Sequence, residues 1–243
     1  MKRFTKVLGG AIAALVLAFP AQADTVLLSV LLNGGSITAG DKVFDRWANT
    51  FYGSSDSTRS FNAANISVTS LDDGGDNPGP GLSFTVLNGE LSITGDDLFA
   101  YLDLTLGFRV SVLPGFDKQI KDNSLGLTNG TVTNLGDNGF YIKETIGTSV
   151  GTADLGDKEV EFSYLDGTGL IQNLTDSAAF APQSEVWVTK NIYVWATGTA
   201  ETASLTGFDQ RFSQQTSSVP EPGTLAVVAV ALAGAGAVRR RRG

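Results

Sequence analysis

Apolar and polar side chains alternate along much of the chain, and this alternation predicts β-strands. Residues 102–112 show it most clearly, because Leu, Phe and Val occupy every second position. Shorter segments alternate in the same way or are rich in β-branched and aromatic residues: 65–71, 83–86, 91–93, 160–164 and 187–195. Turn-forming residues lie between them, at 33–35, 88–89, 94–97, 129–130, 137–139 and 166–167. Short strands at this spacing predict an all-β fold, an antiparallel β-sandwich or jelly roll over residues 24–213.

Three segments do not fit a simple strand pattern. Residues 39–47 are compatible with one helical turn capped by Asp41, or with a short strand. Residues 72–81 contain two prolines and four glycines, which predicts a long loop. Residues 214–218 are expected to be a linker that follows the last strand.

Three tryptophans are expected to contribute much of the core, because each can bury about 150–250 Å². They are Trp47, Trp187 and Trp195. The last two are eight residues apart and so fall on one face of a single strand.

The first 23 residues have the pattern of a secretory signal peptide. Lys2, Arg3 and Lys6 precede an uncharged apolar stretch over 7–19, and Ala21 and Ala23 then supply the small residues that signal peptidase accepts. We therefore expect cleavage before Asp24. An uncleaved anchor helix is the alternative, but the apolar stretch is shorter than the roughly 20 residues of a membrane span.

The last 25 residues form a second signal. Val219, Pro220, Glu221 and Pro222 precede an apolar run over 224–238. Four arginines follow this run: Arg239, Arg240, Arg241 and Arg242. As a helix the run is about 22 Å long, against about 30 Å of hydrocarbon, so it predicts a weak transmembrane helix. The arginines place its C-terminal end in the cytoplasm and the body outside.

The order of motif, apolar helix and arginine cluster over 219–243 resembles the PEP-CTERM sorting signal of Gram-negative bacteria. The resemblance implies an exosortase as processing partner, cutting near residues 220–222 and releasing or re-attaching the body. It also implies an association with extracellular polysaccharide or biofilm matrix. Within the body, segments 34–44, 188–194 and 208–214 resemble those of other bodies that carry such a tail, which implies an uncharacterised exported β domain.

The composition excludes several kinds of chemistry. The chain has no Cys and no His, which excludes disulfides, thiol catalysis, Ser-His-Asp catalysis and the usual zinc sites. Residues 24–219 contain 10 basic and 24 acidic side chains, a net charge of −14. A surface this acidic argues against nucleic acid as a partner.

An acidic surface can attract divalent cations, and one loop is a candidate site. Asp72, Asp73, Asp76 and Asn77 place four oxygen-bearing side chains within six residues. Calcium binds 6–8 such oxygens, although the spacing of an EF-hand is absent. The loop therefore predicts either a calcium site or a solvated polar turn, and no other cofactor is expected.

Carboxylates and aromatic residues are the candidates for chemistry on sugars. A glycosidase needs two carboxylates about 5–10 Å apart, and the candidates are Asp103, Glu144, Glu159 and Glu161. Glu159 and Glu161 share a strand face. Tyr52, Tyr101 and Tyr141 could stack on sugar rings, although most of them are expected to face the core.

These observations predict an exported, exosortase-processed surface or matrix protein without catalytic activity. The tail helix is expected to hold the body at the inner membrane before processing. Two alternatives remain open. One is a carbohydrate-binding module, with or without calcium, and the other is a carboxylate-dependent glycosidase or lyase.

Overall fold

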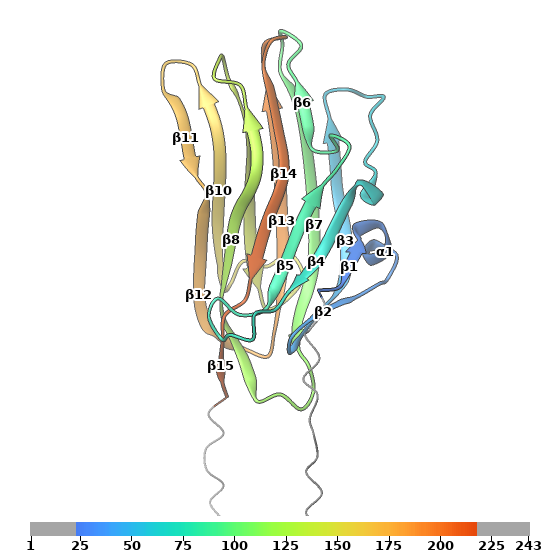
Figure 1. Ribbon diagram of the computed structural model, residues 1–243, viewed down its shortest axis with the longest axis vertical. Helices are drawn as coiled ribbons and strands as arrows, with labels where there is room; N and C mark the ends of the chain where they lie inside the picture. Colours follow the sequence, from blue (N-terminus) through green and yellow to red (C-terminus); the bar gives the residue numbers. More distant parts are fainter. Residues whose placement is uncertain (1–22, 218–243) are drawn as a thin grey trace, which may run out of the picture.

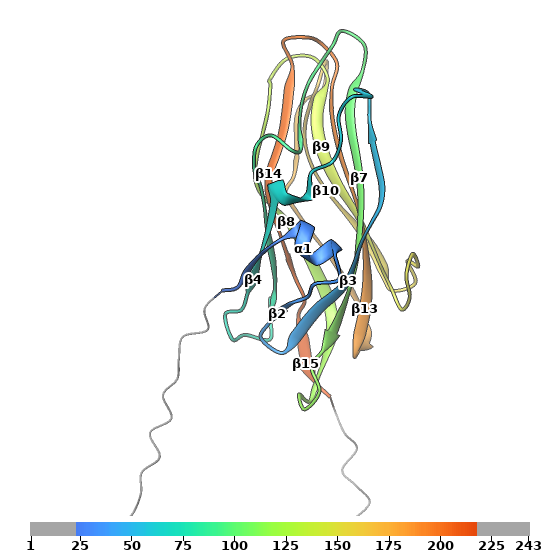
Figure 2. The same ribbon diagram turned by 90° about the vertical axis from the view of Figure 1, so that its right-hand side faces the viewer.

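The computed structural model describes residues 23–217, which form a β-sandwich. Two antiparallel sheets stack face to face, and their strands run along the long axis of the molecule (Figure 1). Figure 2, turned by 90°, shows the two layers from the side. The prediction of an all-β antiparallel sandwich is confirmed.

One sheet has eight strands in the order β1-β4-β5-β14-β8-β12, with β6 paired to β14 and β15 paired to β8. Its strands are β1 (Thr25–Leu27), β4 (Ile66–Leu71), β5 (Gly81–Val86), β6 (Ser92–Thr94), β8 (Lys118–Val132), β12 (Thr175–Gln183), β14 (Thr202–Arg211) and β15 (Gln214–Thr216).

The other sheet has seven strands in the order β11-β10-β9-β13-β7-β3-β2. They are β2 (Ile37–Ala39), β3 (Lys42–Ser54), β7 (Ala100–Val112), β9 (Asn138–Gly147), β10 (Gly156–Leu165), β11 (Gly169–Asn173) and β13 (Glu185–Ala196). β13 lies at its centre and pairs with both β7 and β9 over most of its length.

The core lies between the sheets and follows the period-two pattern. Every second residue of β7 from Ala100 to Val110 is buried, and β13 alternates in the same way. Trp47 is 6% exposed and its ring stacks on Phe108 with centroids 4.4 Å apart. Trp187 and Trp195 share a face as predicted, but the expectation that they fill the core is wrong, because they lie on the outer side of β13.

The helix suggested for residues 39–47 is not formed. This segment instead closes β2 and enters β3 through a turn at Gly40, whose φ of +55° suits glycine. Phe44 and Trp47 then face the core from β3. The described residues contain a five-residue helix elsewhere, α1 (Leu28–Leu32), and a short 3₁₀ helix, η1 (Ala63–Asn65).

Two segments that were expected to lie outside strands form strands instead. The pair Asn129-Gly130, expected to be a turn, lies inside β8, where the register with β14 shifts. Residues 214–216, expected to be linker, form β15 and pair with β8. Gln214 is buried there and accepts a hydrogen bond from the Nζ of Lys42, which joins the end of the body to the start of β3.

Candidate functional site

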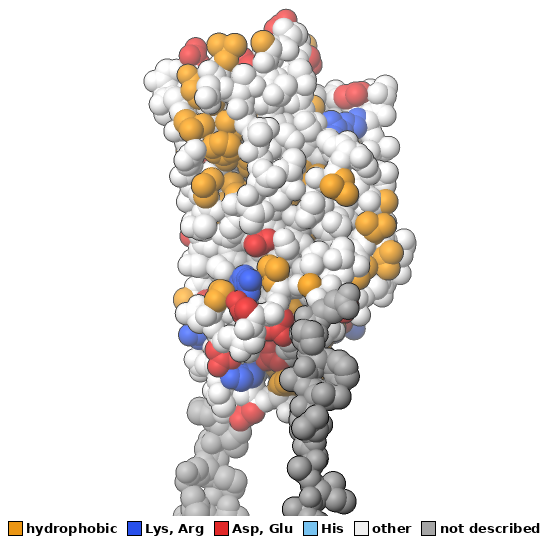
Figure 3. Space-filling view, viewed as in Figure 1, with side chains coloured by type: hydrophobic (Ala, Val, Ile, Leu, Met, Phe, Trp, Pro, Cys, Tyr) orange, Lys and Arg blue, Asp and Glu red, His pale blue; other side chains and the backbone are white. Residues whose placement is uncertain are grey.

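The loop before β5 holds the four side chains that suggested calcium. It lies at the end of the molecule that carries β15, where charged side chains gather on the surface drawn in Figure 3. Gly40, Phe116 and Lys118 line a surface pocket together with parts of this loop. The loop itself is irregular from Asp72 to Pro80, as predicted.

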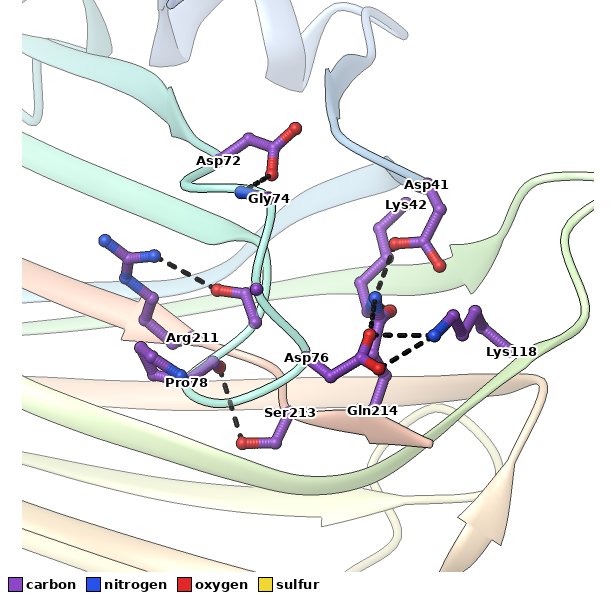
Figure 4. Close-up of polar contacts among 12 residues, drawn as sticks. Asp41, Lys42, Asp72, Gly74, Asp76, Pro78, Lys118, Arg211, Ser213 and Gln214 are labelled. Atoms are coloured by element: carbon purple, nitrogen blue, oxygen red, sulfur yellow. Dashed lines mark hydrogen bonds and ion pairs between the residues drawn. The ribbon is translucent and has the colours of Figure 1, made fainter. Parts of the chain in front are cut away.

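The structure directs the four loop side chains to separate partners (Figure 4). Asp76 accepts hydrogen bonds from Lys118 at 2.8 and 2.9 Å and from Gln214 at 2.9 Å. Asp73 pairs with Arg211 at 3.1 Å. The remaining two cap the local backbone or a hydroxyl, because Asp72 accepts from the Gly74 amide and Asn77 from Ser213.

Each of the four side chains in this loop thus contacts another group of the protein. Within residues 23–217 no group of three or more acidic side chains is placed to hold a metal ion. The bond from Lys118 is the largest influence on Asp76 and lowers the pKa of its carboxyl. Ion pairs and turn hydrogen bonds therefore account for the clustered acids.

The carboxylates considered for hydrolysis are not gathered either. Glu144 is fully buried between the sheets and contacts two lysines. Glu159 and Glu161 do share the outer face of β10, as predicted. Asp103 lies on the outer face of β7, three strands away from Glu161 in one cross-strand row.

A cluster of aromatic side chains covers part of the outer face of the seven-stranded sheet. Tyr101 comes from β7, Tyr141 from β9, and Tyr193 and Trp195 from β13. We call these four residues the aromatic surface. All four are half-buried rather than core residues, so the expectation that such tyrosines face the core is wrong for Tyr101 and Tyr141.

Strand register explains why the four rings meet. Trp195 lies opposite Tyr101, and Tyr193 lies opposite Tyr141. Residues directly opposite each other in antiparallel strands have Cβ atoms only about 4.5–5.5 Å apart. Tyr193 stacks on Tyr141 and Tyr101 with ring centroids 5.4 and 5.8 Å apart. Trp195 is tilted against Tyr141 and Tyr193, each 6.1 Å away.

Gly139 lets the indole of Trp195 lie close to the sheet. A Cβ at this glycine would be 2.9 Å from Cη2 of Trp195 and 2.3 Å from Cβ of Ser163. Ser163 is fully buried although it lies on the outer side of β10, and it donates a hydrogen bond of 2.5 Å to Glu161. The missing side chain at Gly139 therefore makes the space that Trp195 occupies.

Polar groups border the aromatic surface. Asn191 donates hydrogen bonds to Asp103 at 2.5 Å and to Thr105 at 3.2 Å, next to Tyr193. Burial, followed by nearby negative charge, raises the pKa of Tyr141 and Tyr193. Their phenol groups therefore stay protonated at neutral pH and can donate hydrogen bonds.

Two neighbouring aromatics do not belong to this surface. Tyr52 stacks on Phe61 and packs against the core, and burial raises the pKa of its phenol. Trp187 shares the outer face of β13 but lies opposite Arg109, at the other end of the strand. Of the four members, Tyr101 and Tyr141 were named from the sequence. Tyr193 and Trp195 could have been found as well, because residues two apart in a strand lie on the same face.

The sorting residues lie outside the described part of the chain, apart from the expected cleavage point. The backbone nitrogen of Asp24 donates a hydrogen bond of 2.9 Å to the hydroxyl of Ser70. No helix within residues 23–217 has the length and apolar character of a membrane span, and the expected tail helix over 224–238 falls beyond them.

A family model settles the nature of the tail. The model of the PEP-CTERM protein-sorting motif matches residues 218–242. The chain therefore carries a PEP-CTERM sorting signal. The signal implies export, processing by an exosortase and sorting towards the cell surface, and it includes Val219, Pro220, Glu221 and Pro222 together with the four arginines.

Two solved structures show a weak similarity to this chain. TmCBM61, solved with beta-1,4-galactotriose, is 13% identical with a TM-score of 0.24, and covers 70% of this chain and 88% of its own. Endoglucanase 3 of Trichoderma harzianum, from family GH12, is 11% identical with a TM-score of 0.21, and covers 80% and 99%. At these TM-scores neither structure defines the function of this chain. A comparison with curated proteins gave no significant match.

Proposed function

We propose that this protein is a non-catalytic component of the cell surface or extracellular matrix that binds polysaccharide through the aromatic surface. The observation that carries the proposal is the contiguous group of four half-buried rings on the outer face of the seven-stranded sheet. Aromatic side chains that serve only to fill the core would lie on the inner face of the sheet, not on its outer face. Aromatic faces bordered by a few hydrogen-bonding groups suit a ligand with apolar ring faces and many hydroxyls.

The polar border supplies the second half of this recognition. Asp103 and Glu161 can accept hydrogen bonds from sugar hydroxyls, and the phenols of Tyr141 and Tyr193 can donate them. The acids also sit at opposite ends of one cross-strand row that contains Tyr193 and Tyr141. A sugar chain lying across the strands would meet an acceptor, two rings and a second acceptor in turn.

The placement of the carboxylates favours binding over hydrolysis. Asp103 and Glu161 are separated by three strand spacings, about 14 Å, which exceeds the roughly 5–10 Å of glycosidase pairs. Glu159 and Glu161 are closer but stand side by side on one strand, so they cannot approach a glycosidic bond from opposite sides. Glu144 is buried within the core.

Processing would place this surface outside the cell. In the proposed sequence of events the tail helix holds the body outside the inner membrane, and an exosortase then acts near residues 220–222. The aromatic surface lies at the end of β13 that is remote from β15, the strand that leads into the tail. The ring cluster would therefore face away from the membrane while the tail is still attached.

The test is binding to the extracellular polysaccharide of the producing cells, measured by retardation in native gels that contain it. The wild-type chain is expected to be retarded, and Trp195→Ala and Tyr193→Ala to lose most of the retardation. A loss of about 1–2 kcal/mol per ring is expected, because truncation to Ala removes apolar contact area worth about 25 cal/mol per Å². Trp187→Ala is the matched control, since it removes a tryptophan from the same face of the same strand.

Two results would count against the proposal. If the wild-type chain is not retarded, or if Trp187→Ala and Trp195→Ala reduce retardation equally, the aromatic surface is not the binding site. Shortening of the polysaccharide during the assay would instead indicate the alternative, a glycosidase or lyase.

A further inference from the structure

The interior of the sandwich contains a charged cluster. Glu144 of β9 is opposite Lys158 of β10 and opposite Lys190 of β13, so the three side chains form one row on the inner face of the seven-stranded sheet. All three are 0–2% exposed. Oε1 of Glu144 lies 2.6 Å from Nζ of Lys158, and Oε2 contacts Nζ of Lys190.

The two lysines do not have equivalent surroundings. Lys190 donates to Glu144, and its Nζ also lies 5.5 Å from the ring centroid of Phe208. Lys158 is held to Glu144 by an ion pair that lacks the angles of a hydrogen bond. One carboxylate thus pairs with two buried lysines. Only Lys190 also donates a hydrogen bond to it, so the amine of Lys158 has fewer interactions.

The other sheet contributes a buried amide without a partner to the interior. Asn123 of β8 is 0% exposed, and neither its Oδ1 nor its Nδ2 has a hydrogen-bond partner. Leaving such a group unpaired in the interior costs about 1–3 kcal/mol, so its presence calls for an explanation. Gln210 of the neighbouring β14 reaches across the core and donates to Glu144 at 2.7 Å.

The strand that carries Lys158, β10, contacts both β12 and β8, the strand that carries Asn123. Ala178 of β12 lies opposite Asn123, and a Cβ at Gly156, two residues before Lys158, would be 3.1 Å from the Cβ of Ala178. The amide of Glu159, the next residue, donates 2.9 Å to Asp176 of β12. Lys158 therefore enters the core beside the β12 segment that pairs with Asn123.

We infer that Lys158 and Asn123 form an intramolecular isopeptide bond between the two sheets, with Glu144 as the proton-transfer group. The bond would join β10 to β8 by a covalent amide in a chain that contains no cysteine. It would also give the unpaired amide of Asn123 a chemical role.

The proposed step needs no reagent beyond these side chains. Lys158 first transfers a proton to Glu144, and its neutral Nζ then attacks Cγ of Asn123. Glu144 protonates Nδ2 of Asn123 and recovers a proton from Nζ, so the Cγ–Nδ2 bond breaks and the Cγ–Nζ bond remains. Ammonia takes the proton that Glu144 has recovered and leaves as ammonium, so Glu144 is a carboxylate again, and no atom is oxidised or reduced.

The environment favours this reaction in three ways. Burial is the largest influence on Lys158 and lowers the pKa of its amine, which makes the nucleophilic form more accessible. Fixed neighbouring groups react with effective molarities that reach about 10⁵ M or more. Lys190 remains as an ammonium beside Glu144 and keeps the buried carboxylate paired after Lys158 has reacted.

The first test is the mass of the wild-type protein, which requires no variant. The full chain purified from the producing cells should weigh one ammonia less than its sequence between the termini found. Trypsin should then fail to cut after Lys158 and release peptide 122–143 joined to peptide 144–190. N-terminal sequencing of this species should give two residues per cycle, starting with Asp122 and Glu144.

That sequencing step separates the bond from two other products. A linear peptide over 122–190 from missed cleavage gives one residue per cycle, and a succinimide at Asn123 loses ammonia without joining the peptides. Either product in place of the branched peptide, or an unchanged mass, would overturn the inference.

Arginine variants identify the attacking lysine. Lys158→Arg keeps a positive charge near Glu144 but cannot form the amide, so the ammonia should be retained in full. Lys143→Arg, at an exposed position of β9, is the control and should still lose it. A branched peptide that persists in Lys158→Arg would assign the bond to another lysine and overturn the assignment to Lys158. The wild-type peptide map decides the question if a variant does not fold.

Discussion

Gly139 is the residue on which the shape of the aromatic surface depends most directly. Replacing it with Val is expected to push the indole of Trp195 off the sheet, because a Cβ there would be 2.9 Å from Cη2 and 2.3 Å from Ser163 Cβ. The overpacking should cost about 1–3 kcal/mol of stability and lower polysaccharide retardation. Tryptophan fluorescence reports the position of the indole, urea unfolding measures the stability, and native gels measure the retardation.

Gly107→Ala is the matched control for that substitution. Gly107 lies on the outer face of β7, and a Cβ there would meet only the carbonyl oxygen of Val188, at 3.5 Å. Retardation and stability should both stay near wild type. Equal losses in the two variants would mean that the sheet, and not the position of Trp195, is what the substitutions disturb.

Asp76 is expected to make the body sensitive to acid. Its hydrogen bonds from Lys118 and then Gln214 lower the pKa of its carboxyl in the folded state. A group with a lowered folded pKa stabilises the protein above its unfolded pKa of about 3.9, and this stability is lost as the pH falls through the folded value. Asp76→Asn should therefore flatten the fall in melting temperature below about pH 4.

Asp157→Asn, which removes one exposed carboxylate from β10, is the control for the change in net charge. If Asp76→Asn and wild type lose stability in parallel between pH 4 and 2, the ion pair with Lys118 does not contribute to the folded state.

Among the elements, β15 shows that the body extends further than the sequence suggested. Deleting residues 214–243 should destabilise the body relative to deleting only 218–243, because Gln214 is a partner of the fully buried Lys42 and of Asp76. Hydrogen bonds to charged groups are worth about 1.5–3 kcal/mol each, so a loss of about 3 kcal/mol is expected in urea unfolding. Equal stability of the two deletion variants would show that residues 214–216 do not stabilise the body and act as a linker.

The sequence predicted those elements whose pattern depends on period two alone. β7 was predicted because apolar residues fill every inward position from Leu102 to Val110. β8 was not predicted, because Asn129 and Gly130 have the composition of a turn, while in the fold they lie at a shift of register against β14. Tertiary pairing decides such cases, and no local pattern reports it.

The two sites differ from the predictions for related reasons. Period two places Tyr193 and Trp195 on one face, but which face of β13 meets the other sheet depends on the alternate residues, such as Val194 and Ile192. The charged cluster was missed because Glu144, Lys158 and Lys190 are far apart in sequence and meet only through strand pairing. The partners of the acidic loop were not predicted, since Lys118, Arg211 and Gln214 come from other parts of the chain.

At the scale of the whole molecule, the β-sandwich and the sorting signal are separate parts of the chain. The sandwich closes at β15, and the matched motif begins at residue 218. The aromatic surface and the start of the tail lie at opposite ends of the strands, separated by about 35 Å along β7. Changes in the motif are therefore expected to alter the location of the protein without altering its binding.

Replacing Pro220 and Pro222 with Ala should test this separation directly. The wild-type protein is expected outside the cell as a species that starts at Asp24 and ends within residues 220–222, as measured by intact mass. The variant should remain in the membrane fraction with Arg239–Arg242 still attached, because the exosortase lacks its motif. After extraction in mild detergent it should be retarded by polysaccharide like the wild type. A wild-type protein that keeps its arginines in the membrane would show that the tail is a permanent anchor, and weaker retardation of the variant would show that the tail contributes to binding.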